Sequence, residues 1–163
     1  MWSEGEVIKI WGIARPDATG ALENPAVLRA MPRYVKVVKG QLPARYTLAR
    51  LAEASFSDGF SDEDLFREHE RALEKERRVM EAMDEKETLA VPPKPCRSLL
   101  HLKILLGSRI MRKCCLCERR CGVDRAGGRL GYCRLGDGMR ISSSFVHLGE
   151  EPEIVPSFTV CGL

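Results

Sequence analysis

The sequence has no long hydrophobic run and no strong excess of either charge. No apolar stretch approaches the roughly 20 residues that a membrane-spanning helix needs. Lysine and arginine total 26 against 23 for aspartate and glutamate, and the net charge of +3 is small for a nucleic-acid-binding protein. The first residues lack the basic segment and apolar run of a signal peptide. These absences argue against a membrane protein and against nucleic acid as a partner, and they predict a cytoplasmic protein.

Cysteine, by contrast, is plentiful and concentrated in one stretch. Five of the seven cysteines lie between Lys113 and Cys133, in KCCLCERRCGVDRAGGRLGYC. An odd number of cysteines in a chain without a secretion signal favours metal or redox use over disulfides. Four of the cysteines have the spacing C-x2-C-x3-C-x11-C, and thiolates bind zinc and iron well. The sequence therefore predicts one metal site whose ligands are Cys114, Cys117, Cys121 and Cys133.

The identity of the metal stays open between zinc and an iron–sulfur cluster. Zinc ribbons usually pair two C-x2-C knuckles, which this spacing does not do, whereas clusters accept irregular spacings. Neighbouring basic side chains would offset the charge of the thiolates and lower their pKa; these are Arg112, Lys113, Arg119, Arg120 and Arg125. Cys115 is expected to be a bystander thiol, and Cys96 a small buried hydrophobic residue.

The first 112 residues are expected to be mainly helical. Pro16 to Gly20 reads as a turn, Asn24 and Pro25 start a short helix through Met31, and another helix spans 44–55. Ser61 caps a long helix to about Glu87, whose inward face would carry Phe66, His69, Leu73, Met80 and Met83. Prolines at 92, 93 and 95 form a stiff linker. A further helix over 97–112, with Leu99, Leu102, Leu105 and Ile110 inward, leads to Cys114.

After the cysteines the pattern changes to strand. Met139–His147 and Ile154–Val160 are rich in serine and β-branched residues, although Pro156 limits the second to a sheet edge. The two pieces are expected to be too little for a sheet of their own and to stay loosely ordered. The predicted class is therefore α+β: a helical region over 1–95 with its linker, a helix and cysteine segment over 96–138, and strand-like residues over 139–163.

The cysteine segment also resembles a known family. The pattern C-x-L-C-x-R-x-C-G-V-x-R followed by G-x-x-G-Y-C is similar to that of radical SAM proteins of the pyruvate formate-lyase activating enzyme-like family. The likeness extends to His147–Pro152, to Val155-Pro156-Ser157 and, upstream, to ENPAVLRAM, GQLPARY and SLLHLKILL of archaeal members. Glu118 stands where proline is usual, and Arg129 where glutamate is usual.

The resemblance implies a 4Fe-4S enzyme that cleaves S-adenosylmethionine to a 5′-deoxyadenosyl radical, acting on a protein or a small molecule. It implies that His147, Glu150 and Glu151 lie near the S-adenosylmethionine site and that Cys161 is the first ligand of the catalytic cluster. The C-x3-C-x2-C motif of that cluster and the catalytic TIM-type barrel are absent from these 163 residues. A downstream reading frame would have to supply them, so the chain alone is expected to be an inactive fragment.

Two functions remain for the sequence. The first is a portion of a radical SAM enzyme that binds metal through its four cysteines. The alternative is a stand-alone zinc-binding interaction module, whose arginines could contact nucleic acid.

Overall fold

The computed structural model describes residues 13–155 and 157–162, which form two compact units. One unit joins the residues up to Lys36 with those from Met139 onward, and the other spans Val37–Gly138. Helices and one two-stranded antiparallel sheet make up the described residues, which contain no barrel, and this confirms the predicted α+β class. The predicted boundary near residue 95 lies inside the second unit, because the helices before and after it pack together.

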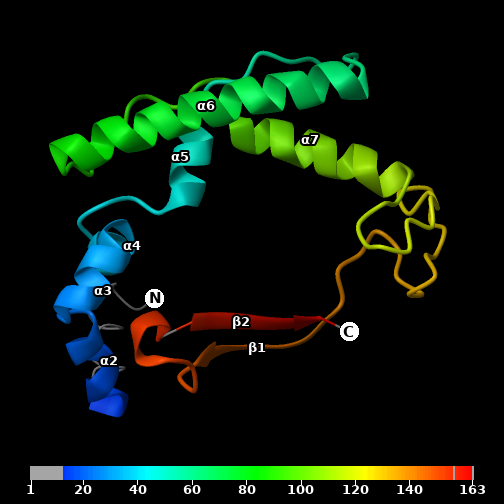
Figure 1. Cartoon of the computed structure of the whole chain (residues 1–163). Coiled ribbons are helices and arrows are strands. Elements are labelled where there is room, and N and C mark those ends of the chain that lie inside the picture. Colours follow the sequence, from blue (N-terminus) through cyan, green and yellow to red (C-terminus); the bar gives the residue numbers. More distant parts are fainter. Residues whose placement is uncertain (1–12, 156, 163) are drawn as a thin grey trace. The chain divides into compact units, whose positions relative to one another are not determined.

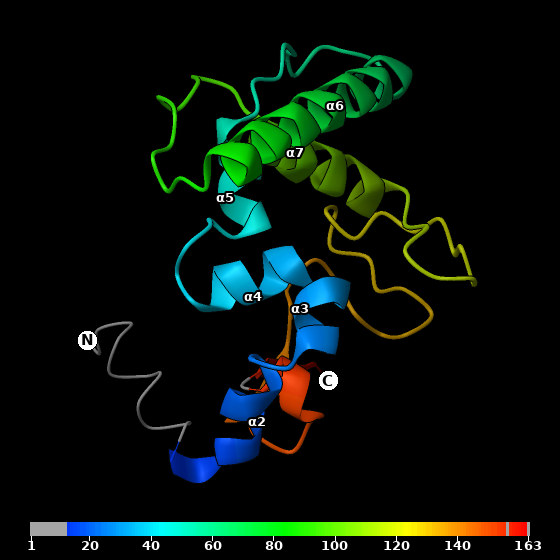
Figure 2. The same cartoon turned by 60° about the vertical axis from the view of Figure 1, so that its left-hand side comes forward.

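The second unit is built from three helices: α5 (Arg45–Leu51), α6 (Asp62–Lys86) and α7 (Leu99–Arg112). Helix α5 contacts both of the longer helices, and α6 and α7 pack side by side (Figures 1 and 2). Small and aliphatic side chains fill the space between them; the buried cluster is Ala49, Ala52, Ala54, Leu65, Ala72, Leu99, Leu102 and Leu106.

Helix α6 begins and ends as predicted, and its expected inward face is confirmed in part. The Ser61 side chain accepts a hydrogen bond from the Asp64 amide at 3.1 Å, and Glu87 ends the helix in a left-handed conformation. Met83 is buried, and Leu73 and Met80 pack against buried clusters, as expected. Phe66, however, is 49% exposed, and the other buried residues of α6 are Leu65, Glu68, Ala72 and Glu76. The two glutamates are tolerated there because each has a partner: the Ser55 amide donates to Glu68 at 2.7 Å, and Arg45 pairs with Glu76 at 3.3 Å.

Helices α5 and α7 are each shorter than predicted, and the same contact explains both. The chain leaves α5 in an extended conformation, so that the Leu99 amide donates to the Ala52 carbonyl at 2.8 Å and the Ala54 amide to the Arg97 carbonyl at 3.1 Å. Helix α7 therefore starts at Leu99, with Ser98 as its N-cap. Of its expected inward residues, Leu99 and Leu102 are buried, and Leu105 is partly buried against the same cluster, which also contains Leu106.

Cys96 is exposed, so the prediction that it is a buried hydrophobic residue was wrong. It follows a proline-rich segment without helix or strand that runs over the surface between α6 and α7, and no helix face covers it.

The first unit contains helices α2 (Pro16–Ala21), α3 (Pro25–Ala30) and the start of α4 (Pro32–Val38), together with strands β1 (Ile141–His147) and β2 (Ser157–Gly162) and the short 3₁₀ helix η1 (Pro152–Ile154). The predicted turn at Pro16 is a helix, because proline at the first helical position has the required φ and no amide to satisfy. The helix at Pro25 is confirmed, with the Asn24 side chain accepting from the Ala26 amide at 2.8 Å.

The two strand-like pieces pair with each other, which corrects the expectation that they could not form a sheet. β1 and β2 are antiparallel, with Phe145 opposite Thr159 and His147 opposite Ser157. Between them η1 packs against α2, and Val155 beside it is only 1% exposed. An isolated hairpin is marginal in water, so we attribute its order to this contact with the N-terminal helix.

None of the helices in the described part of the chain is both long and apolar enough to cross a membrane.

Candidate metal centre

The backbone after α7 folds back on itself and brings Cys114 close to Cys121, the first and third of the predicted ligands. The Cys114 amide donates to the Val123 carbonyl at 3.1 Å, and the Gly122 amide donates to the Cys114 carbonyl at 2.9 Å. Gly122 has a φ of +66°, a left-handed conformation that favours glycine and allows this reversal. A third bond, from the Arg125 amide to the Met111 carbonyl at 2.8 Å, ties the returning segment to the last turn of α7.

Arg125 lies at the centre of this loop and is only 5% exposed. Its Nε donates to the sulfur of Cys114 at 3.0 Å, and its Nη2 donates to the sulfur of Cys133 at 3.2 Å. Its Nη1 donates to the carbonyl oxygen of Leu135 and, at 3.4 Å, to that of Gly136. One planar side chain thus joins the start, the middle and the end of the cysteine segment.

The electrostatics of the loop favour ionised sulfur. The guanidinium of Arg125 lowers the pKa of Cys133, and the Leu135 amide adds to the effect. The backbone amides of Val123 and Tyr132 lower the pKa of Cys121, with smaller contributions from Cys114 and Arg125. Since the thiolate is the form that binds metals, both shifts prepare these residues to act as ligands.

The structure therefore brings two of the four predicted ligands to one side chain and places a third, Cys121, beside the first of them. Cys114 is buried and Cys121 is half-buried, while Cys133 and Cys117 are exposed. The sulfurs of Cys114 and Cys133 contact the guanidinium, and Cys121 interacts with Cys114. Across residues 13–155 and 157–162, no three His, Cys, Asp or Glu side chains are arranged to hold an ion. The donor chemistry fits a thiolate-binding metal. Cys117 lies on a turn where its carbonyl accepts from the Arg120 amide at 3.0 Å.

The other predicted residues lie in the first unit or at the surface of the second. Cys115 is exposed beside the predicted ligands. Cys161 is half-buried in β2, where its carbonyl accepts from the Ser142 hydroxyl at 3.0 Å. His147 ends β1, and its Nδ1 lies 2.8 Å from the Glu150 carboxylate, whereas Glu151 is exposed before η1.

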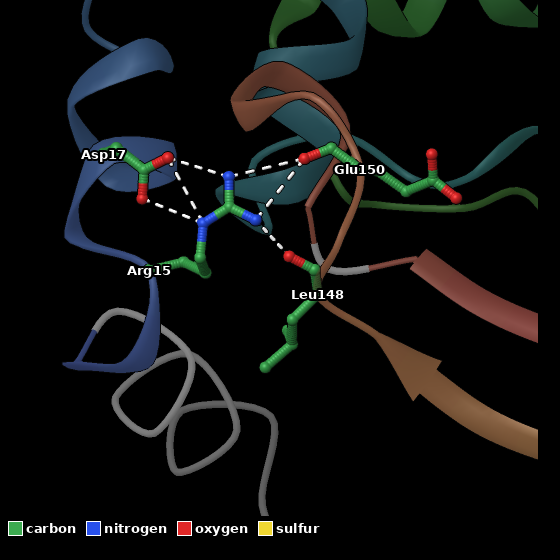
Figure 3. Close-up of polar contacts among 4 residues, drawn as sticks. All are labelled: Arg15, Asp17, Leu148 and Glu150. Atoms are coloured by element: carbon green, nitrogen blue, oxygen red, sulfur yellow. Dashed lines mark hydrogen bonds and ion pairs between the residues drawn. The ribbon is translucent and has the colours of Figure 1, made fainter.

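A side chain that the sequence did not single out holds this turn. The guanidinium of Arg15 donates to the carbonyl oxygens of Leu148 and Glu150, and it also pairs with Asp17 at 2.7 Å (Figure 3). These contacts join residues more than 130 positions apart, so no local pattern could have indicated them.

Comparison with known proteins finds a relative that matches most of this chain, but the match covers only a minor part of the relative. An uncharacterized protein of Methanocaldococcus jannaschii is 34% identical over 132 residues, which are 80% of this chain but 37% of the relative. No family model matches the chain, and no solved structure matches it. The chain thus spans little more than a third of the length of the curated relative it matches.

Proposed function

We propose that this chain is part of a radical SAM protein of the pyruvate formate-lyase activating enzyme-like family, and that its cysteine segment binds one metal centre. The observation that carries the metal proposal is the contact of one buried arginine with the sulfurs of Cys114 and Cys133, with Cys121 beside them. The assignment to the family is supported by the resemblance of the sequence motifs.

In this proposal the ligands are thiolates. Cys114, Cys121 and Cys133 contribute three sulfurs from the neighbourhood of Arg125, and Cys117 contributes the fourth from its exposed turn. Arg125 offsets part of the negative charge that four thiolates bring. An iron–sulfur cluster would supply electron transfer at this position, whereas zinc would stabilise the loop without redox chemistry.

The radical SAM part of the proposal concerns the first unit. There His147, Glu150 and Glu151 would border S-adenosylmethionine, and Cys161 would be the first ligand of the catalytic cluster, in a cytoplasmic enzyme acting on a protein or a small molecule. Two sets of hydrogen bonds give this segment a defined conformation. His147 bonds to Glu150, and Arg15 donates to backbone carbonyl oxygens of the same turn. The other two cysteines of C-x3-C-x2-C do not occur in these 163 residues, so this chain by itself should release no 5′-deoxyadenosine.

Metal analysis of anaerobically purified protein tests the proposal. We expect about one zinc or a few irons per chain, with brown colour and visible absorption only for iron–sulfur. The change of Cys114, Cys117, Cys121 and Cys133 together to serine should remove the metal. Cys96→Ser is the matched control, since Cys96 is exposed and lies outside the cysteine segment. Wild-type metal content in the fourfold variant would refute the metal site, and a colourless protein with one zinc would favour the interaction module.

A further inference from the structure

We propose that Arg125 is a positioning residue that assembles the cysteine loop before any metal arrives, and that Gly131 provides the space this requires. The metal-binding consequence rests on the proposed function, whereas the assembly of the metal-free loop does not. The structure supports this role, because the loop is folded around the guanidinium, which donates hydrogen bonds to the sulfurs of Cys114 and Cys133.

The first argument is the burial of the guanidinium. A buried cation is costly unless its donors are paired. Arg125 directs its three nitrogens to two sulfurs and two carbonyl oxygens, and among the described residues no carboxylate forms an ion pair with it. The sulfurs are therefore the groups that stabilise Arg125 in its buried position, and Arg125 in turn holds them close together.

The second argument is the geometry that only a planar fork can satisfy. Three donor positions on one rigid group reach Cys114, Cys133 and Leu135 at once. A lysine ammonium carries the same charge but is a single compact centre on a flexible stem. Arg125→Lys should therefore keep the charge and lose the simultaneous contacts.

The third argument concerns the space that Gly131 leaves for the guanidinium of Arg125. A Cβ added at Gly131 would collide with the Arg125 guanidinium, although the backbone of Gly131 is not in the left-handed region. Gly131→Ala should thus displace the guanidinium while leaving Arg125 in the chain. Gly138→Ala is a matched control, because a Cβ there meets nothing within 4 Å and its backbone is likewise not left-handed.

Hydrogen exchange of the reduced, metal-free full chain tests the assembly. Backbone hydrogen bonds within 114–136, such as Gly122 to Cys114 and Gly131 to Leu135, should slow exchange in the wild type. We expect Arg125→Lys and Gly131→Ala to speed exchange in this segment by about tenfold or more, with α6 unchanged, and Gly138→Ala to behave as wild type. A wild-type loop that exchanges like an unfolded peptide would overturn the proposal, as would wild-type protection in either loop variant.

Cobalt(II) titration distinguishes positioning of ligands from a purely structural role. The d–d bands of cobalt report a tetrahedral thiolate site, and competition with a chelator gives its affinity. Loss of an outer-shell partner typically costs 10–100-fold in metal affinity, and we expect a decrease of this size in both variants, while thermal unfolding of the helices is unchanged. Equal affinity in wild type and both variants would overturn the positioning role. A protected, Arg125-dependent loop that binds no cobalt, zinc or iron would instead refute the proposed metal site and leave the assembly standing.

Discussion

Replacement of Leu102 by alanine tests the packing that supports the cysteine loop. Leu102 is fully buried in the core between α5, α6 and α7, ten residues before the end of α7. The change removes three carbon groups at about 0.8 kcal/mol each, or about 2.4 kcal/mol of transfer free energy. The residual cavity adds to this, and we expect a loss of about 3–4 kcal/mol in the free energy of unfolding.

Urea denaturation followed by circular dichroism measures this loss. With a slope of about 1–3 kcal/mol per molar urea, the midpoint should fall by about 1–4 M. Ile104→Ala is the matched control, because Ile104 lies on the same helix and is 63% exposed; its effect should stay within about 0.5 kcal/mol. A loss below about 1 kcal/mol for Leu102→Ala, or equal losses for both variants, would contradict the described face of α7.

Two further predictions concern polar contacts. Glu68→Ala should cost about 1–3 kcal/mol in urea denaturation because the Ser55 amide loses a buried acceptor; Glu68→Gln should cost less, and equal costs would show that the carboxylate oxygen does not accept this bond. Arg15→Gln should speed amide exchange over 148–154 without changing α6, because it removes the guanidinium that holds Leu148 and Glu150; unchanged exchange there would refute that role.

The long helix shows what local sequence can determine. Ser61 and the acidic residues after it define the start of α6 through contacts made within one turn, so the boundary was predictable. The buried face was predictable only in part, because it also includes Glu68 and Glu76. Their partners, the Ser55 amide and Arg45, come from other segments of the chain.

The cysteine segment was predictable as a cluster but not in its internal arrangement. The sequence presents five basic residues around the cysteines, and nothing in their spacing distinguishes Arg125 from the others. Its role depends on where the chain reverses at Gly122 and on the space left at Gly131, both of which are tertiary features. The spacing pattern treats Cys117 like its neighbours, and it gives no sign that Cys117 is exposed whereas Cys114 is buried.

The strands were recognisable by composition, but their pairing was missed. Pairing depends on the register between Ile141–His147 and Ser157–Gly162 and on the docking of the intervening η1 against α2. The second condition involves α2, a helix more than 130 positions away whose start at Pro16 carries residues typical of a turn.

The bond from Arg15 to the Leu148 carbonyl spans 133 positions, and this separation has a consequence for synthesis of the chain. Most of the helices over 37–112 pack against neighbours close in sequence and can fold as they emerge from the ribosome. Helix α2 emerges before them but lacks η1 until residues 152–154 have been made. Contacts between distant residues form slowly, because the entropy of closing a long loop must be overcome first. Helix α2 is thus expected to complete its packing later than the helices over 37–112.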